Sequence, residues 1–360
     1  MTDTLQINNL PTLTWNWLKI NSTPYAYNDH IAGNGEPHMS ELAKGVLYNA
    51  NASAESDAYY HLETGCGKNL DAQFFGSHVQ PAMLTVQKGV RVKQPMFINF
   101  ELADNSDTAA WYIIKAEEGA EATVIMFFES AKNAGGSQVL RTICDAGKDA
   151  KIHLIKVQLL GKSFTQIDDI GVICGENGCV ELTHIILGGK ETYTGAAATL
   201  SSYKSSFISN TAYLCHNAQK LDMNYIARHI AKKTMCNMSV KGTLQDEAQK
   251  TYRASIDFKN GCSGAEGQEM EETLLLSARA LNKSIPLILC DEEDVAGEHG
   301  ATIGKLSEDV LFYMQSRGIA KTDAEKIMAR AKIASVASLI KDDDVTKKIN
   351  AYLDEAFSHE

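Results

Sequence analysis

Residues 119–124 read Gly119-Ala120-Glu121-Ala122-Thr123-Val124, and they resemble later stretches of the chain. The related stretches are Gly147-Lys148-Asp149-Ala150-Lys151-Ile152, Glu176-Asn177-Gly178-Cys179-Val180-Glu181-Leu182 and Asp246-Glu247-Ala248-Gln249-Lys250-Thr251. Three small residues, Ala122, Ala150 and Cys179, are spaced by 28 and 29 positions. Such a period with strands and tight turns is typical of a β-solenoid, in which each coil stacks on the previous one.

Short apolar or alternating runs recur between Gly, Asn and Asp turns from about residue 46 onward, which favours strands. The clearest runs are 83–86, 96–100, 122–128, 152–157 and 180–187. Pattern alone leaves a β-sandwich open as an alternative to the solenoid. We divide the chain into a peripheral N-terminal arm (1–45), a β-rich core (46–304) and a C-terminal helical subdomain (305–360). Trp15, Trp17 and Leu18 are expected to clamp the arm onto the core.

The stretch from Pro286 to Gly318 links the core to the helices. Residues 286–290 are apolar and predict a last buried strand, whereas the acidic, Gly-punctuated residues 291–304 predict a surface loop. Ser307 suits an N-cap, Arg317 the last helical turn and Gly318 the position after it.

Two more helices are predicted after Gly318. Thr322 suits the N-cap of the first, whose expected apolar face contains Ala324, Ile327, Met328, Ala331, Ala334 and Leu339. The second spans 345–357, with Ile349, Leu353 and Phe357 on one face. Because a solenoid needs its open end covered, these helices are expected to cap it.

Composition narrows the function classes. The formal net charge of −11 argues against nucleic acid as the main partner, since phosphate binding needs a basic face. No apolar run reaches about 18 residues, so no membrane span is expected. The first residues lack the features of a signal peptide, and the expected location is cytoplasmic. The eight cysteines contain no Cys-x-x-Cys pair and are expected to be thiols, mostly buried.

No nucleotide-binding motif is complete. A P-loop needs Gly, four residues, and then Gly-Lys-Ser/Thr. Gly161-Lys162-Ser163 supplies the end of the motif, but Lys156 stands where the first Gly is required. We therefore expect this chain to bind no nucleotide, and any ATP use would belong to a partner.

One long ordered pattern points to a known family. It comprises Asp294-Val295, His299-Gly300-Ala301-Thr302, Gly304, Leu311-Phe312-Tyr313 and Ser316-Arg317-Gly318-Ile319. This pattern resembles the C-terminal signature of the SufB/SufD family of iron–sulfur cluster assembly scaffolds, and the likeness is clear over residues 210–335. The resemblance implies a right-handed parallel β-helix and favours the solenoid over the sandwich. It further implies a non-enzymatic scaffold that pairs with a second SufB/SufD-type protomer, as a homo- or heterodimer. It also implies a SufC-type ABC ATPase partner and a cysteine desulfurase system.

The resemblance implies roles for particular residues. His299 matches a histidine at the interface between two protomers, where a transient iron–sulfur cluster is proposed to form. The family's ligand positions differ here, because Gly297, Ala280 and Gly300 stand where relatives have cysteine or glutamate. Glu298 and Cys290 are nearby substitutes by residue type. Leu311, Phe312, Tyr313 and Arg317 are expected to be buried or to contact the ATPase.

Two other functions stay open from the sequence. The first is a β-helix carbohydrate-active enzyme, which would need paired carboxylates or Arg and Lys on an exposed face. The second is a structural partner that stabilises the ATPase and holds no cluster. A sulfur-accepting thiol among Cys174, Cys179, Cys215, Cys236 and Cys262 cannot be ranked from the sequence.

Overall fold

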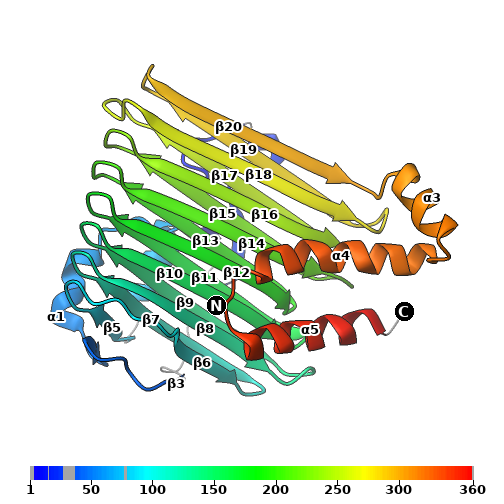
Figure 1. The fold of residues 1–360 in the computed structure, drawn as a ribbon, viewed down its shortest axis with the longest axis horizontal. Helices are drawn as coiled ribbons and strands as arrows, with labels where there is room; N and C mark the ends of the chain where they lie inside the picture. The colour runs from blue at the N-terminus through cyan, green and yellow to red at the C-terminus, as the bar shows by residue number, and fades with distance from the viewer. Residues whose placement is uncertain (1–3, 15, 27–36, 77–78, 359–360) are drawn as a thin grey trace.

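The computed structural model describes residues 4–14, 16–26, 37–76 and 79–358, and its main body is a parallel β-solenoid of two facing sheets (Figure 1). Each coil contributes one strand to each sheet, so strands two apart in sequence are neighbours. One sheet runs β20-β18-β16-β14-β12-β10-β8-β6-β3 and the other β19-β17-β15-β13-β11-β9-β7-β5-β4. The strand pairs from β5 to β20 are parallel, which confirms the solenoid and excludes the sandwich.

The even-numbered sheet consists of β3 (His38–Met39), β6 (Met96–Leu102), β8 (Glu121–Ser130), β10 (Lys151–Leu160), β12 (Cys179–Gly188), β14 (Ser206–Cys215), β16 (Met235–Leu244), β18 (Ala265–Leu275) and β20 (Val295–Gly304). The odd-numbered sheet consists of β4 (Val46–Asn49), β5 (Pro81–Val86), β7 (Ser106–Ala116), β9 (Gly135–Ala146), β11 (Ser163–Cys174), β13 (Glu191–Leu200), β15 (Lys220–His229), β17 (Gln249–Phe258) and β19 (Leu281–Cys290). At the first coil, β3 and β4 pair antiparallel to β6 and β5.

The turns before β8, β10 and β12 show why the sequence repeats. Gly119, Asp149 and Asn177 adopt left-handed φ values of 68°, 54° and 52°, which Gly, Asp and Asn tolerate best. The strand register aligns the residues that follow them, so the repeating small residues are Ala120, Ala150 and Gly178. Our alignment with Ala150 was therefore wrong by two positions for Ala122 and by one position for Cys179. The turn that this alignment identified does repeat.

The solenoid interior is a single apolar core with a polar minority. Alternate residues of the solenoid strands point inward and stack in columns from coil to coil. Buried polar side chains also lie inside the solenoid. Lys156 forms an ion pair with Asp168 and donates to the Thr142 hydroxyl at 2.9 Å. Burial lowers the pKa of the neighbouring His184 to about 4, so this imidazole is neutral near pH 7.

The outer face of the odd-numbered sheet is covered by the N-terminal arm together with the segment that follows β4. The arm contributes β1 (Thr4–Ile7), the 3₁₀ turn η1 (Asn16–Leu18) and β2 (Thr23–Ala26), and the segment after β4 contributes α1 (Ser53–Ser56), the 3₁₀ turn η2 (Asp57–Tyr59) and α2 (Lys68–Gly76). Ile7 and Tyr25 are buried against this face, and Arg253 is hydrogen bonded to Thr23. Trp17 and Leu18 are exposed, so our expectation that they clamp the arm was wrong, while Trp15 lies outside the described residues.

The C-terminal helices are α3 (Glu308–Ser316), α4 (Lys321–Ala337) and α5 (Asp343–Ser358). Figure 1 shows α4 and α5 lying across the face of the even-numbered sheet, against the outward residues of β8 to β18. The expected cap over the open end was therefore wrong. Ile349, Leu353 and Phe357 are buried as predicted.

The predicted apolar face of α4 was largely wrong. Ile327, Ala331, Ala334 and Leu339 are exposed, whereas Ala329, Ile333, Val336 and Ala337 pack against the sheet. Ala320 rather than Thr322 occupies the N-cap position.

The link from the core to the helices also differs from our prediction. Ser307 caps α3 by accepting from the Val310 N–H, and Gly318 has a left-handed φ of 83°, both as predicted, but Arg317 is the C-cap rather than part of the last turn. Residues 295–304 form strand β20 instead of a loop, and β19 is only half-buried. Two of the three glycines in β20 lie close to side chains of the preceding coil, because a Cβ at Gly297 would lie 3.0 Å from Phe258 and one at Gly300 2.9 Å from Met270.

Candidate functional site

The last coil of the solenoid is open. Within the described part of the chain, no strand pairs with the outer edge of β19 or β20, and no helix covers them. The inward-facing residues of these strands are consequently half-buried or exposed rather than buried. Unpaired strand edges beside exposed apolar side chains are a template for pairing with another chain.

The hydrogen-bond pattern tells which backbone groups are unpaired. On β19, Leu281 and Asp291 donate to the β17 side at 2.9 and 2.8 Å, so the even-numbered residues face the open edge. Pro286 is among them, and its missing N–H costs no sheet hydrogen bond. On β18, Glu266 and Leu276 donate towards β16, so the alternate residues of β18 bond to β20. By the same alternation, the N–H groups of His299 and Ala301 face the open edge.

His299 lies in the middle of β20, exposed, and is paired in register with Glu269 of β18. Neighbouring strands lie about 4.8 Å apart, and paired residues of a parallel sheet point to the same face. Because the Glu269 side chain is buried within the solenoid, His299 also faces inward, over the opening. A histidine and a glutamate thus stand side by side at the mouth of the last coil.

Glu269 sits in an unusual electrostatic setting. Burial and the neighbouring Glu271 carboxylate raise the pKa of Glu269 to about 7, although Lys250 acts in the opposite direction. The fully buried Lys250 forms an ion pair with Glu271. The Glu271 carboxylate also accepts hydrogen bonds from the hydroxyls of Thr273, at 2.8 Å, and Ser284. Among the described residues, Glu269 therefore has no cation paired with it. A carboxylate of this kind can hold or release a proton near neutral pH.

Glu298 and Cys290 do not join His299. Glu298 points to the opposite face of β20, where it accepts from Gln268 at 3.4 Å. Cys290 ends β19 and faces inward, but the residue opposite it is Val295 at the start of β20. His299 is four residues further along, or about 13 Å at 3.3 Å per residue. The described residues contain no group of three or more His, Cys, Asp or Glu that could hold a metal ion.

The cysteines separate into two kinds. Cys290 is exposed, contrary to our expectation of a strand-buried thiol, and its sulfur lies 3.0 Å from the Glu292 carbonyl. Cys174, Cys215, Cys236 and Cys262 are buried, and Cys179 is partly buried. Burial raises the pKa of the Cys215 and Cys236 thiols to about 12, which suppresses the reactive thiolate.

Helix α3 presents a second exposed surface. Phe312 is 74% exposed and Tyr313 60%, and the Arg317 guanidinium lies 5.4 Å from the Tyr313 ring centre. Leu311 is only partly buried. Large aromatic side chains left this exposed on one helix are typical of a protein-binding surface.

The sequence singled out His299 but missed Glu269. Nothing in the local sequence distinguishes Glu269 from the neighbouring Glu271 and Glu272. What would have identified Glu269 is its pairing with His299, 30 positions later in the sequence, on the neighbouring strand. No helix in the described part of the chain is long and apolar enough to cross a membrane.

Comparisons with known proteins identify the family of this chain. A family model described as "SUF system FeS cluster assembly, SufBD core domain" matches residues 100–332. The chain is 23% identical over 273 residues to the iron–sulfur cluster assembly protein SufD of Bacillus subtilis, covering 74% of this chain and 62% of that protein. It is 24% identical over 340 residues to SufD of Escherichia coli, covering 89% of this chain and 77% of that protein. It is 23% identical over 329 residues to SufB of Bacillus subtilis, covering 85% and 70%. Since the family model spans more than half of the sequence, this chain belongs to the SufBD family.

Proposed function

We propose that this chain is one protomer of an iron–sulfur cluster assembly scaffold, which pairs with a second SufB/SufD-type protomer through its open last coil. The observation that carries the proposal is the unpaired edge of β19 and β20 with His299 facing the opening. Membership of the SufBD family supports the general role. It also favours a scaffold over a carbohydrate-active enzyme.

His299 and Glu269 would be this protomer's ligands for a nascent cluster, which is cargo rather than a resident cofactor. A neutral imidazole is a suitable iron ligand, and a carboxylate beside it can bind iron or take up a proton. Two residues cannot complete a cluster site. The remaining ligands would come from the partner protomer, and iron and sulfur from other proteins of the system.

Helix α3 would carry the ATPase. Exposed Phe312 and Tyr313 supply an aromatic anchor of the kind that dominates binding energy at interfaces. The helix directly follows β20 through residues 305–307, so a movement imposed on α3 would act on the last coil. ATP hydrolysis by the partner could thereby change the protomer interface without any nucleotide binding to this chain.

Anaerobic co-expression with a SufC-type ATPase and candidate second protomers tests the proposal. The purified complex is weighed by native mass spectrometry, and its iron and sulfide are measured. We expect a complex containing both partners. A chain that stays monomeric with every partner would overturn the pairing, and a dimer that never retains the ATPase would overturn the α3 assignment.

A second role is favoured by a specific observation. The described residues contain no cluster of three or more metal-binding side chains, and Cys290 lies well away from His299. The chain could therefore stabilise the ATPase without touching a cluster. In that case the complex would form normally, and replacing His299 would leave iron and sulfide content unchanged.

A further inference from the structure

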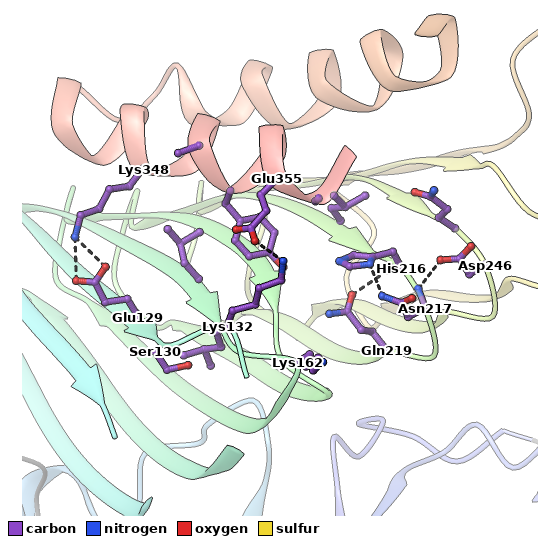
Figure 2. Close-up of a pocket in the computed structure, with 17 residues that line it drawn as sticks. Glu129, Ser130, Lys132, Lys162, His216, Asn217, Gln219, Asp246, Lys348 and Glu355 are labelled. Atoms are coloured by element: carbon purple, nitrogen blue, oxygen red, sulfur yellow. Dashed lines mark hydrogen bonds and ion pairs between the residues drawn. The ribbon is translucent and has the colours of Figure 1, made fainter. Parts of the chain in front are cut away.

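A pocket of about 600 Å³ lies where the edge of the solenoid, from the turn after β8 to the turn after β16, meets helix α5 (Figure 2). Its position follows from the lengths of the turns along that edge. Residues 161–162 and 189–190 are two-residue connections between strands, whereas 131–134 and 216–219 on either side are four-residue connections. The short turns leave a notch two coils wide, and α5 forms its roof.

Gly188 keeps space between the solenoid edge and α5. Gly188 and Gly189 both have left-handed φ values, 77° and 78°. A Cβ on Gly188 would lie 2.0 Å from the Leu160 carbonyl oxygen and 3.0 Å from the Tyr352 hydroxyl of α5. A side chain at position 188 would thus collide with both the floor and the roof. Because Gly188 has no side chain, the Tyr352 hydroxyl can lie close to this turn, and Tyr352 lines the pocket.

The pocket combines an apolar interior with a charged rim. Leu159, Leu160 and Leu214 contribute apolar surface from the sheet, opposite Tyr352 and Ala356 of α5. A concave site of this size with a few polar groups is typical of small-molecule binding.

Two of the three acidic side chains of the rim are paired with lysines, and the third, Asp246, is hydrogen bonded to a backbone N–H. Figure 2 shows Lys348 bonded to both oxygens of Glu129, each at 2.9 Å, and Lys132 paired with Glu355. Asp246 accepts from the Asn217 backbone N–H at 2.7 Å. By contrast, Lys162 makes no ion pair with any residue that the structure describes. Two of the six charged side chains in the lining therefore have no ion-pair partner among the described residues, the Lys162 ammonium and, three strands further along the edge, the Asp246 carboxylate.

His216 adds an unpartnered donor. Its Nδ1 lies 2.7 Å from the Asn217 amide nitrogen. Because an amide nitrogen only donates, Nδ1 is the acceptor and the neutral ring carries its hydrogen on Nε2. That Nε2 atom is buried and has no hydrogen-bond partner among the described residues. His216 and Lys162 follow strands two steps apart in the sheet, about 10 Å at the usual strand spacing.

We propose that this pocket binds a small organic anion, with its apolar or aromatic body between the sheet and α5 and its anionic group held by Lys162 and His216 Nε2–H. A buried donor without a partner and an ammonium without an ion pair, about 10 Å apart along the sheet edge, favour a ligand with acceptor oxygens that carry negative charge. The apolar walls favour a hydrocarbon or aromatic body over a bare inorganic ion. The site is separate from the open end of the last coil and does not depend on cluster assembly.

Anilinonaphthalene sulfonate is a suitable probe, because it is a fluorescent organic anion, and N-phenylnaphthylamine is its uncharged counterpart. Both are titrated into the full-length protein. We expect saturable binding of the sulfonate, weakened about tenfold by Lys162→Gln and about fivefold by His216→Phe. The uncharged probe should change by less than about twofold in Lys162→Gln. Lys190→Gln, on the neighbouring short turn but outside the pocket, is the matched control and should bind both probes normally.

Ala351→Trp should abolish binding of both probes by filling the pocket, with circular dichroism confirming the fold. Three results would overturn the proposal. The sulfonate could fail to bind saturably, Lys162→Gln could weaken both probes equally, or Ala351→Trp could leave binding intact. If Ile303→Asp in the last coil abolishes binding instead, the probe occupies the open end.

Discussion

His299 and Glu269 are paired in register on adjacent strands β20 and β18, and both side chains face the interior of the solenoid at its open end. Glu269 is buried and His299 is exposed, so the pair marks the boundary between the packed core and the surface available to a partner. A partner covering the last coil would bury His299 as well. The imidazole would then lie between two protein bodies with a carboxylate directly beside it.

The open edge of β20 should be required for pairing. The Ala301 N–H faces that edge, so Ala301→Pro removes one donor from the interface and no hydrogen bond to β18. We expect association with the partner protomer to weaken at least about tenfold, measured by analytical ultracentrifugation. Ala301→Val keeps the donor and should associate normally. Equal association of the two variants would show that this edge does not pair.

Exposed aromatic residues on α3 should bind the ATPase without supporting the fold. Phe312→Ala and Tyr313→Ala should change the free energy of unfolding by less than about 0.5 kcal/mol, because both side chains are largely solvent-exposed. Each should weaken ATPase binding by about 2 kcal/mol in calorimetry. Gln315→Ala on the same helix is the control. Undiminished binding by the double variant would place the ATPase elsewhere.

Packing of α5 on the even-numbered sheet should contribute strongly to stability. Ile349 is only 1% exposed and packs among apolar residues of α5 and the sheet. Ile349→Ala should therefore lower the free energy of unfolding by about 2 to 5 kcal/mol. Ile327 of α4 is 46% exposed, and Ile327→Ala should change it by about 0.5 kcal/mol or less. Urea denaturation measures both. Similar losses in the two variants would contradict the packing of these helices.

Buried His184 should make the protein acid-sensitive. Its pKa is lowered to about 4 by burial, while Asp168 raises it and Lys156 lowers it. The unfolded chain therefore binds a proton before the folded one does, and stability is lost as the pH falls from about 6.5 to 4. His184→Met should remove about 3 kcal/mol of that loss. Urea denaturation of the wild-type protein and of His184→Met at pH 6.5 and at pH 4 measures this difference. Equal losses of stability in the two proteins between these pH values would contradict the account.

Much of the fold was predictable because the turns repeat. The left-handed residues Gly119, Asp149 and Asn177 recur once per coil, and each precedes a small residue and a strand. Strand β20 was missed because three glycines and a neighbouring acidic run carry the local signature of a loop. Pairing with β18 and close contact with Phe258 and Met270 override that preference, and neither is visible in a local window.

The candidate site was only half predictable for the same reason. His299 stands inside a family signature, whereas the importance of Glu269 depends on the strand register. Glu298 was chosen because it adjoins His299 in sequence, yet the period of two in a strand places it on the opposite face. The face of α4 was misassigned because alanines and isoleucines occur all around this helix.

The most direct measurement is the iron and acid-labile sulfide content of the anaerobically purified complex carrying His299→Ala, with Glu298→Ala as the matched control on the other face of the strand. Our account predicts that both variants assemble into complexes of normal mass. Iron and sulfide should fall by about tenfold or more in His299→Ala and stay normal in Glu298→Ala. Normal iron and sulfide in the His299→Ala complex would contradict the account.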